Sequence, residues 1–438
     1  MTYADLGQAL REVEGGLVLA VIIAGLAFRS RFRKIPIWTV MAFAAFLTVV
    51  LGLVNPNDVD EYVDWDVILF LIGMFSLGAL AYTSGLLEYV ALRVLFRARS
   101  AMAVVLLLTL TLGLVSAFAV NDAVAAMGSL MVLPLIRAAG LDPELSILVL
   151  AFAVTIGSTM TPIGNPQNML IAIESGIKAP LFTFLVLLGP PTVVNLFVTA
   201  LLLARLYNAG ARPLRGVYKI PEEAITDRWD ATLAGAALIL VIALLAANDV
   251  LELEGKPHIT DIGIIPFTVA AGAYVLSRRP REVIKEVSWS TIVFFIVMFV
   301  AMRGIWDSGV LDWLLRAMMP AKGSTLGNVA RITVASLALS QLLSNVPFVQ
   351  LFAIYMKSLG FSAADVTSWA TLAMASTIAG NLTVLGAASN VIIIESMESR
   401  YGVSISYARF AKVGALVTAV NTLIYLAYML PVAALLKM

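Results

Sequence analysis

The segment TPIGNPQNMLI, residues 161–171, interrupts an apolar stretch that begins with LSILVLAFAVTIGSTM at residue 145. Two prolines, a glycine, a glutamine and two asparagines fall within its first eight residues. In the hydrocarbon of a membrane, every backbone polar group has to be satisfied inside the protein. Proline lacks the N–H donor and clashes with the preceding turn, so Pro162 and Pro166 prevent a continuous helix. We therefore predict two half-helices within residues 144–176, joined by an unwound loop.

The composition places this loop in a membrane protein. Of 438 residues, 61% are hydrophobic and only 13% are charged, and the mean hydropathy is +0.95. Soluble domains carry about 25% charged residues. Many apolar stretches reach the ~18 residues that a spanning helix needs. There is no signal peptide with a small-residue cleavage site, so we expect the first apolar segment to remain as a helix. The predicted fold class is an all-α polytopic membrane protein.

Several classes of protein and site are excluded by residue content. The chain has no cysteine, which rules out disulfides, iron–sulfur clusters and thiolate metal sites. The single histidine, His258, lies in a polar loop and is expected to be solvated rather than to bind a metal. The basic residues are scattered among short loops, so no nucleic-acid partner is predicted. No nucleophile–base pair, metal-ligand cluster or phosphate-binding loop is evident, so we predict no enzyme, catalytic residue or cofactor.

An internal duplication organises the chain. WDVILFLIGMFSLGALAYTSGLLEY, from Trp65, matches WSTIVFFIVMFVAMRGIWDSGVLDW, from Trp289, at an offset of 224 residues. The same offset brings Asn121 of VNDAV onto Asn345 of SNVPF. TIGSTMTPIGNPQN (155–168) then matches TIAGNLTVLGAASN (377–390) at an offset of 222. Because the matches occur in the same order in both halves, they indicate two repeats rather than chance.

Each repeat is predicted to hold about five transmembrane helices, a re-entrant hairpin and a helix broken at the midplane. A hairpin returns to its own side, so five crossings per half make the second repeat inverted relative to the first. The hairpin tips are Asn121-Asp122 and Ser344-Asn345. The predicted boundaries are 1–205 for the first repeat (hairpin 101–138, broken helix 144–176), 206–230 for a cytoplasmic linker, and 231–438 for the second repeat (hairpin 327–359, broken helix 366–397).

Loop charges predict the orientation in the membrane. With both termini outside, the loops on the inner side hold far more Lys and Arg than those on the outer side, and the acidic loop 55–66 falls outside. Cytoplasmic loops carry such an excess. We predict a multi-pass protein of the cell (inner) membrane with both termini outside.

Two matched breaks in opposed repeats predict a transport site at the midplane. Ordinary Pro/Gly kinks packed by side chains are the alternative. The pairing of VNDAV with TPIGNPQN, and of SNVPF with GAASN, resembles the ion transporter superfamily, and within it the arsenite-efflux permeases (ArsB), with NhaD sodium/proton antiporters and citrate or dicarboxylate carriers as relatives. The resemblance implies a scaffold and a transport domain, with the substrate site between hairpin tips and loops. Carried over, it implies substrate contacts from Asn121, Gly164, Asn165, Gln167, Asn168, Ser344, Asn345, Thr383, Gly386, Ser389 and Asn390, and places Asp122 beside them.

Asp122 is the only ionisable residue between Ser100 and Arg137. Because burial penalises a charged carboxylate, it is predicted to hold the coupling proton and to cycle between charged and neutral forms. Capping the descending hairpin arm is the plainer alternative. The other site residues are neutral, which suits a neutral polyhydroxy solute or a small cation better than a dianion. Dicarboxylate carriers have Ser-Asn-Thr at both tips, whereas this chain has Val-Asn-Asp and Ser-Asn-Val.

The predicted function is export of arsenite or antimonite from the cytoplasm in exchange for protons, a secondary antiport that uses no metal. The partners are then the small inorganic solute, protons and the lipid bilayer. Three further functions remain open: a sodium/proton antiporter of the same fold, a channel-like permease, and the membrane subunit of an ATPase-driven arsenite pump. The chain lacks G-x-x-x-x-G-K-[ST], so ATP use would need a separate soluble ATPase partner.

Overall fold

Residues 3–29, 36–210, 221–319 and 321–436 are described in the computed structural model, and every regular element within them is a helix. This confirms the predicted all-α polytopic membrane protein. Among the described residues, seven helices are long and apolar enough to cross a membrane, or eight if one bent pair counts as a span. The bent pair is Pro166–Ser175 with Pro180–Leu187, whose axes differ by 117°.

The first half of the chain runs from the amino terminus to the linker. A 3-10 turn (Pro56–Asp58) and the short helix α3 (Val59–Tyr62) lie between its second and third long helices. The remaining helices are α1 (Tyr3–Arg29), α2 (Ile37–Val50), α4 (Trp65–Thr83), α5 (Leu86–Leu95), α6 (Ala101–Ala119), α7 (Asn121–Ala138), α8 (Glu144–Ser158), α9 (Pro166–Ser175), α10 (Pro180–Leu187) and α11 (Gly189–Leu206).

The second half repeats this order of elements. Residues 211–220 of the predicted linker lie outside the described residues, and a 3-10 turn (Pro221–Ala224) precedes the first helix of this half. The helices are α12 (Arg228–Leu253), α13 (Ile264–Leu276), α14 (Pro280–Glu286), α15 (Trp289–Ser308), α16 (Asp312–Met318), α17 (Thr325–Leu343), α18 (Asn345–Ser358), α19 (Val366–Ala379), α20 (Ala388–Tyr401) and α21 (Tyr407–Leu436).

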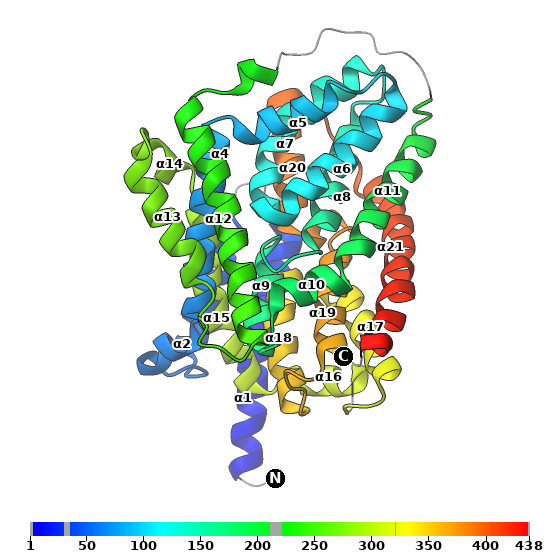
Figure 1. Cartoon of the computed structure of the whole chain (residues 1–438). Coiled ribbons are helices and arrows are strands. Elements are labelled where there is room, and N and C mark those ends of the chain that lie inside the picture. Colours follow the sequence, from blue (N-terminus) through cyan, green and yellow to red (C-terminus); the bar gives the residue numbers. More distant parts are fainter. Residues whose placement is uncertain (1–2, 30–35, 211–220, 320, 437–438) are drawn as a thin grey trace.

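The two halves point in opposite directions. In Figure 1 the α6–α7 hairpin lies in the upper half of the molecule and the α17–α18 hairpin in the lower half. The half-helix α8 lies above α9, whereas α19 lies below α20. Each hairpin packs on the half-helix that follows it, α6 against α8 and α17 against α19. Matched elements with reversed direction are the arrangement of an inverted repeat.

The helices form two packed groups. We call α1, α2, α4, α12, α13 and α15 the framework helices, in which α2 packs on α15 and α4 on α13. We call α6–α9, α11 and α17–α21 the site helices, in which α11 and α21 pack on each other and on the broken helices. The groups meet where α15 contacts α18 and α4 contacts α9. The short amphipathic helices α5 and α16 each follow a framework helix and precede a hairpin.

Each hairpin turns through one residue in the left-handed region. Val120 has φ of 61° and Ser344 has φ of 69°, and the two occupy matched positions immediately before Asn121 and Asn345. A β-branched residue such as Val120 is rarely found at positive φ, so neighbouring contacts must hold it there. One such contact is the bond from Asn121 N to the Gly164 carbonyl, 2.8 Å long, which ties the first tip to the first unwound loop.

Candidate substrate site

The two unwound loops are held by asparagines at matched positions. Asn168 Nδ2 donates to the carbonyls of Ser158, Thr159 and Thr161 at 3.1, 3.2 and 3.1 Å. Asn390 Nδ2 donates to Gly380 and Thr383 at 2.7 and 3.2 Å, which are the positions that match Ser158 and Thr161 in the second repeat. A helix that stops inside a protein leaves its last carbonyls without donors. These side-chain amides replace the missing donors.

Close backbone approach explains the two matched glycines. A Cβ on Gly164 would lie 2.3 Å from the Ser158 carbonyl oxygen, so no larger residue fits without a shift. A Cβ on Gly386 would lie 3.0 Å from the Ala379 oxygen and 3.1 Å from Gly380 Cα. Each loop therefore doubles back over the end of the helix it leaves.

Each hairpin is bonded to its own loop through a threonine. Thr161 Oγ1 donates to the Ala117 carbonyl of α6. In the second half Thr383 Oγ1 donates to Gln341 Oε1 of α17 at 2.8 Å, and Gln341 Nε2 donates to the Ala379 carbonyl at 2.8 Å. Hairpin and loop therefore form one bonded unit in each repeat.

A cavity of about 310 Å³ lies between the hairpin tips, the two broken helices and the first turns of α2 and α15. Five predicted site residues line it: Asn121, Asp122, Gln167, Ser344 and Asn345. The structure thus brings together both tips and the first residues of α9, which are far apart in sequence.

Seven predicted residues lie outside the wall of this cavity. Asn165, Asn168 and Asn390 are completely buried and bond within or between the broken helices. Thr383 faces Gln341, and the two glycines make the close approaches described above. Ser389 is also completely buried, and its hydroxyl has no hydrogen-bond partner among the described residues. These side chains give the loops their shape and lie behind the cavity surface.

Several lining residues were not predicted from the sequence. Thr155 and Thr377, the first residues of the matched TIGSTM and TIAGNL segments, both face the cavity. Their matched positions were the signal that could have found them. The remaining walls come largely from the framework helices, whose sequence carries no break to single them out. These residues are Pro36, Ile37, Trp38, Ser288, Ser290, Thr291, Phe294 and Phe295.

The polar groups around the two loops are satisfied to different degrees. Thr377 Oγ1 accepts from Asn165 Nδ2 at 3.4 Å and Gln167 Nε2 at 3.2 Å, and donates to Asn168 Oδ1 at 3.2 Å. Six other buried side-chain oxygens near the broken helices and the hairpin tips have no partner among the described residues, although such groups are nearly always bonded. They are Asn381 Oδ1, Ser389 Oγ and Asn390 Oδ1 at the second break, Asn121 Oδ1 and Asn345 Oδ1 at the hairpin tips, and Thr155 Oγ1 of α8.

Asp122 lies where two cavities meet. It lines the 310 Å³ cavity and a neighbouring one of about 230 Å³ that is also lined by Glu286, Ser288 and Arg400. Val120, not Asp122, is the N-cap of α7, and the cap makes no side-chain bond, so the predicted capping role is wrong. No Lys or Arg of the described residues forms an ion pair with Asp122. Glu286 and Arg400 are exposed, so the second cavity leads to the protein surface.

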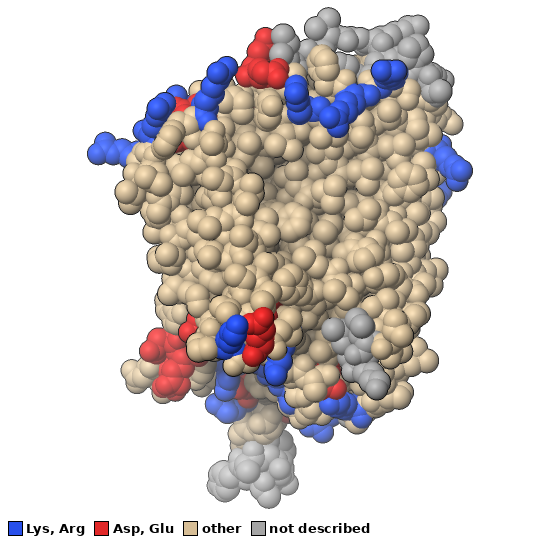
Figure 2. All heavy atoms as spheres, in the orientation of Figure 1, with Lys and Arg blue, Asp and Glu red and all other residues tan. Residues whose placement is uncertain are grey.

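That surface is the basic end of the molecule. Figure 2 shows more Lys and Arg than Asp and Glu along the upper rim of this face, whereas the lower end carries both signs of charge side by side. Asp122 is thus connected to the basic end in this structure, and the cavity lies at the centre of an all-helical membrane protein.

Paired hairpin tips, matched helix breaks and a central polar cavity define a membrane transporter built from repeats. The chain belongs to the citrate transporter family, because the family model for CitMHS, the citrate transporter, matches residues 18–379. This agrees with the predicted superfamily. The arsenite-permease branch remains a prediction.

Individual relatives extend over nearly the same length. The uncharacterized transporter Rv2685 of Mycobacterium tuberculosis (strain ATCC 25618 / H37Rv) is 30% identical over 433 residues, covering 94% of this chain and 97% of the relative. The silicon efflux transporter LSI3 of Oryza sativa subsp. japonica is 26% identical over 409 residues, covering 80% and 83%. The crystal structure of the Alcanivorax borkumensis YdaH transporter superimposes with a TM-score of 0.54 at 13% identity and covers 87% of both chains. This last similarity supports the fold alone.

Proposed function

We propose that this protein is a secondary efflux transporter that exports arsenite or antimonite in exchange for protons. The observation that carries the proposal is the charge of the cavity. Among the described residues that line it, Asp122 is the only ionisable one. A citrate or dicarboxylate anion would have no cationic partner there and would face a carboxylate at low dielectric, which is unfavourable.

A neutral hydroxylated solute suits the remaining walls. Hydroxyl and amide groups of Asn121, Gln167, Ser344, Asn345 and Thr155 can donate to and accept from the hydroxyls of such a solute. Arsenous acid, As(OH)₃, is neutral at pH 7, and silicic acid, the solute form of silicon in water, is a neutral polyhydroxy molecule as well. The name of the rice relative, a silicon efflux transporter, supports this class of solute.

Asp122 supplies the proton side of the exchange in this proposal. A carboxyl at membrane depth with no cationic partner is more stable when neutral, so a proton should bind whenever the site loses contact with water. Its second cavity, leading to the basic end, gives the proton a route. We place that end in the cytoplasm and both termini outside, because cytoplasmic loops carry the excess of Lys and Arg.

Proton flux in proteoliposomes tests the proposal. Liposomes with a trapped pH dye and an imposed pH gradient receive arsenite, antimonite, silicic acid, citrate, Na⁺ and Li⁺ in turn. We expect arsenite and antimonite to collapse the gradient and citrate to leave it unchanged. Asp122→Asn should abolish the response, whereas Asp365→Asn, an acidic residue away from the cavity, should keep it. A response to citrate alone would show that the proposed solute is wrong.

A small cation is the second candidate solute. The six unpaired oxygens at the second break, at the hairpin tips and on Thr155 are the ligand type that hard cations prefer. With Asp122 as counter-charge, they favour a sodium/proton antiporter over a channel-like permease or a pump subunit. In the same assay this function predicts gradient collapse with Na⁺ or Li⁺ and none with arsenite. Arsenite flux without any proton movement would instead indicate a channel-like permease or a pump subunit that needs an ATPase.

A further inference from the structure

An apolar groove opens beside the first hairpin, away from the substrate cavity. It has a volume of about 650 Å³ and lies between one face of α5, one face of α6 and Leu238 of α12. Among the described residues that line it, only Thr111 is polar, and the groove-lining Leu114 is 43% exposed. The groove therefore faces the lipid, and it joins a framework helix to a hairpin of the site helices.

Two exposed arginines follow the groove-lining Val94 in the connection from α5 to α6, which we call the apex of the groove. Helices α5 and α6 form its sides, and residues 96–100 connect them at the basic end of the molecule. Arg97 and Arg99 in this connection are exposed, and neither forms an ion pair with a carboxylate that the structure describes. Arg93, one turn earlier, is instead paired with Glu222 at 3.3 Å. Phe96, at the same apex, is 61% exposed.

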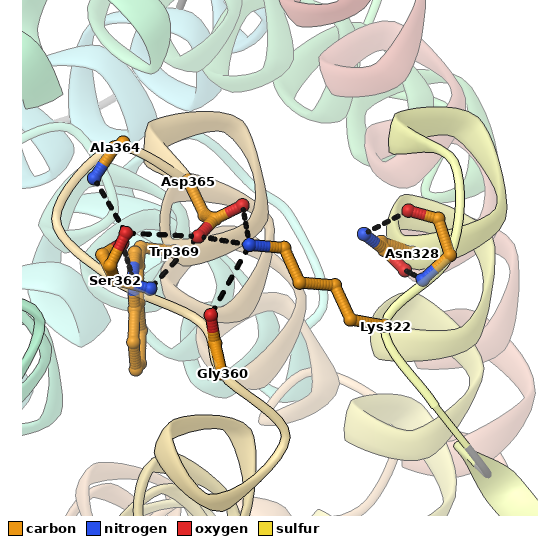
Figure 3. A network of polar contacts seen from close by, with 8 residues as sticks. Lys322, Asn328, Gly360, Ser362, Ala364, Asp365 and Trp369 are labelled. Atoms are coloured by element: carbon orange, nitrogen blue, oxygen red, sulfur yellow. Dashed lines mark hydrogen bonds and ion pairs between the residues drawn. The ribbon is translucent and has the colours of Figure 1, made fainter.

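The matched place in the second half differs in both size and charge. The groove lined by residues of α1, α16, α17 and α18 has a volume of only about 180 Å³. Its apex, between α16 and α17, carries Lys322, whose ammonium lies 2.7 Å from the Asp365 carboxylate and 3.3 Å from the Gly360 carbonyl (Figure 3). The repeat offset brings Arg97 and Arg99 onto Ala321 and Gly323. Lys322 is thus paired with a carboxylate, whereas Arg331, which donates to the Ala321 carbonyl at 3.3 Å, is the one cation at this apex without an ion pair among the described residues.

We propose that the α5–α6–α12 groove, which we call the lipid groove, binds an anionic phospholipid. The acyl chains would occupy the apolar groove, and the headgroup phosphate would bind Arg97 and Arg99. Arginine forks match phosphate oxygens, and basic pockets between membrane helices at the cytoplasmic side recognise anionic headgroups. Among the described residues, a large apolar groove with two unpaired cations occurs at the first of these two matched places and not at the second.

Such a lipid would touch both groups of helices. Its chains would contact Leu238 of the framework helix α12 and Leu114 of the hairpin helix α6. Occupancy of the groove should therefore stabilise the folded protein by binding its native state. The inference does not depend on which solute the central cavity carries.

Native mass spectrometry and thermal unfolding of the purified full-length protein test the inference. The protein is exchanged into detergent containing either phosphatidylglycerol or phosphatidylcholine. We expect retention of phosphatidylglycerol and a higher Tm with it than with phosphatidylcholine. The double variant Arg97→Gln/Arg99→Gln should lose about 30-fold in affinity for phosphatidylglycerol, since each basic residue near an anionic surface contributes roughly fivefold. Leu114→Trp, which fills the groove, should lower retention of both lipids.

Lys322→Gln is the matched control at the other apex and should keep the preference for phosphatidylglycerol. Equal retention of both lipids by the wild type would overturn the inference. So would an equal loss in Lys322→Gln and in the arginine double variant. A dimer that excludes lipid while Leu114→Trp dissociates it would show that a second copy of the chain covers the groove instead.

Discussion

The side-chain polar groups at the first break all have hydrogen-bond partners among the described residues, whereas several at the second break do not. Asn165 caps α9 by accepting from Asn168 N at 2.8 Å, and Pro166 follows it in the first helical position. At the matched place in the second loop, Ala387 makes no side-chain cap. Thr377 of α19 accepts from two amides at the first break and donates to Asn168 Oδ1, whereas the matched oxygens Thr155 Oγ1 and Asn390 Oδ1 have no partner among the described residues. The two helix breaks thus share a backbone shape, but within the described part of the chain only the second leaves buried side-chain oxygens without hydrogen bonds.

This difference indicates where a bound solute can form the most new hydrogen bonds. A group that already has its hydrogen bonds gains little from a solute, whereas an unpaired buried oxygen gains a full interaction. The hairpin tips also differ, but in charge: Asp122 of the first tip corresponds to Val346 of the second. We infer that the first half supplies the proton carrier, and that the unpaired acceptors come from both halves, namely from the second break, the two hairpin tips and Thr155.

The largest expected effect concerns the two tips. Asp122→Asn should abolish solute-driven proton movement, because an amide side chain, unlike a carboxylate, does not take up and release a proton near neutral pH. Val346→Asp in the Asp122→Asn background moves the carboxyl to the other tip and tests whether its position matters. We expect no recovery, because Asp122 also lines the second cavity, which Val346 does not. Proteoliposome proton flux is the measurement, and full recovery would contradict the assignment.

The next largest effect is on stability, and it should differ between the two asparagines that hold the loops. Asn168→Ala leaves three carbonyls without a donor and should lower the free energy of unfolding by about 3 kcal/mol. Asn390→Ala leaves two carbonyls and should cost about 2 kcal/mol. Thermal unfolding of both variants in detergent checks the order. Equal stability of both variants and the wild type would mean that water replaces these donors.

A smaller effect distinguishes the matched threonines. Thr377→Val removes the hydroxyl that bonds three amide side chains and should destabilise the protein by about 2 kcal/mol. Thr155→Val removes an unpaired hydroxyl, so stability should stay the same or rise. Its effect should instead be weaker solute binding, seen as a higher KM for transport. If Thr155→Val is the less stable variant of the two, the described difference between the loops is wrong.

The smallest effect is at the Lys322–Asp365 ion pair, which joins the connection before α17 to the one before α19. Burial raises the pKa of Asp365, but hydrogen bonds from Lys322 and Ser362 outweigh it and hold that pKa below its ordinary value. Because the folded-state pKa is lowered, the stabilisation is complete above about pH 4 and is lost as the pH falls through the folded value. The pair is partly exposed, so Asp365→Asn should cost at most about 1 kcal/mol. Unfolding from pH 7 to pH 3 should show a shallower acid loss in the variant than in the wild type.

Part of this architecture follows from local chemistry. Helix α8 ends at Ser158 and α9 begins at Pro166, so the helix is interrupted where the prolines predict it. The second interruption, between Ala379 and Ala388, contains no proline and was predicted only through its match with the first. The first break could be predicted directly because proline lacks the N–H donor, and this interrupts a helix whatever the rest of the fold does.

The candidate site could be predicted only in part. Asn121, Asp122, Gln167, Ser344 and Asn345 line the cavity, and each belongs to a quoted motif. Asn165, Asn168 and Asn390 belong to the same motifs, yet their side chains turn away to bond freed carbonyls. Residue type alone does not distinguish an amide that binds a solute from one that binds its own backbone, since both offer the same donors and acceptors.

The sequence by itself determined the membrane class, the duplication, the positions of the breaks and the single acidic residue of the first hairpin. These depend on hydropathy, repetition and the covalent structure of proline, which act locally. Only the tertiary structure decided that Thr155, Thr377 and the first turns of α2 and α15 complete the cavity. It also decided that, among the described residues, the side-chain polar groups at the first break are paired and several at the second break are not. These outcomes depend on which distant side chains come within about 3 Å of one another, and the packing of the two inverted halves sets those distances.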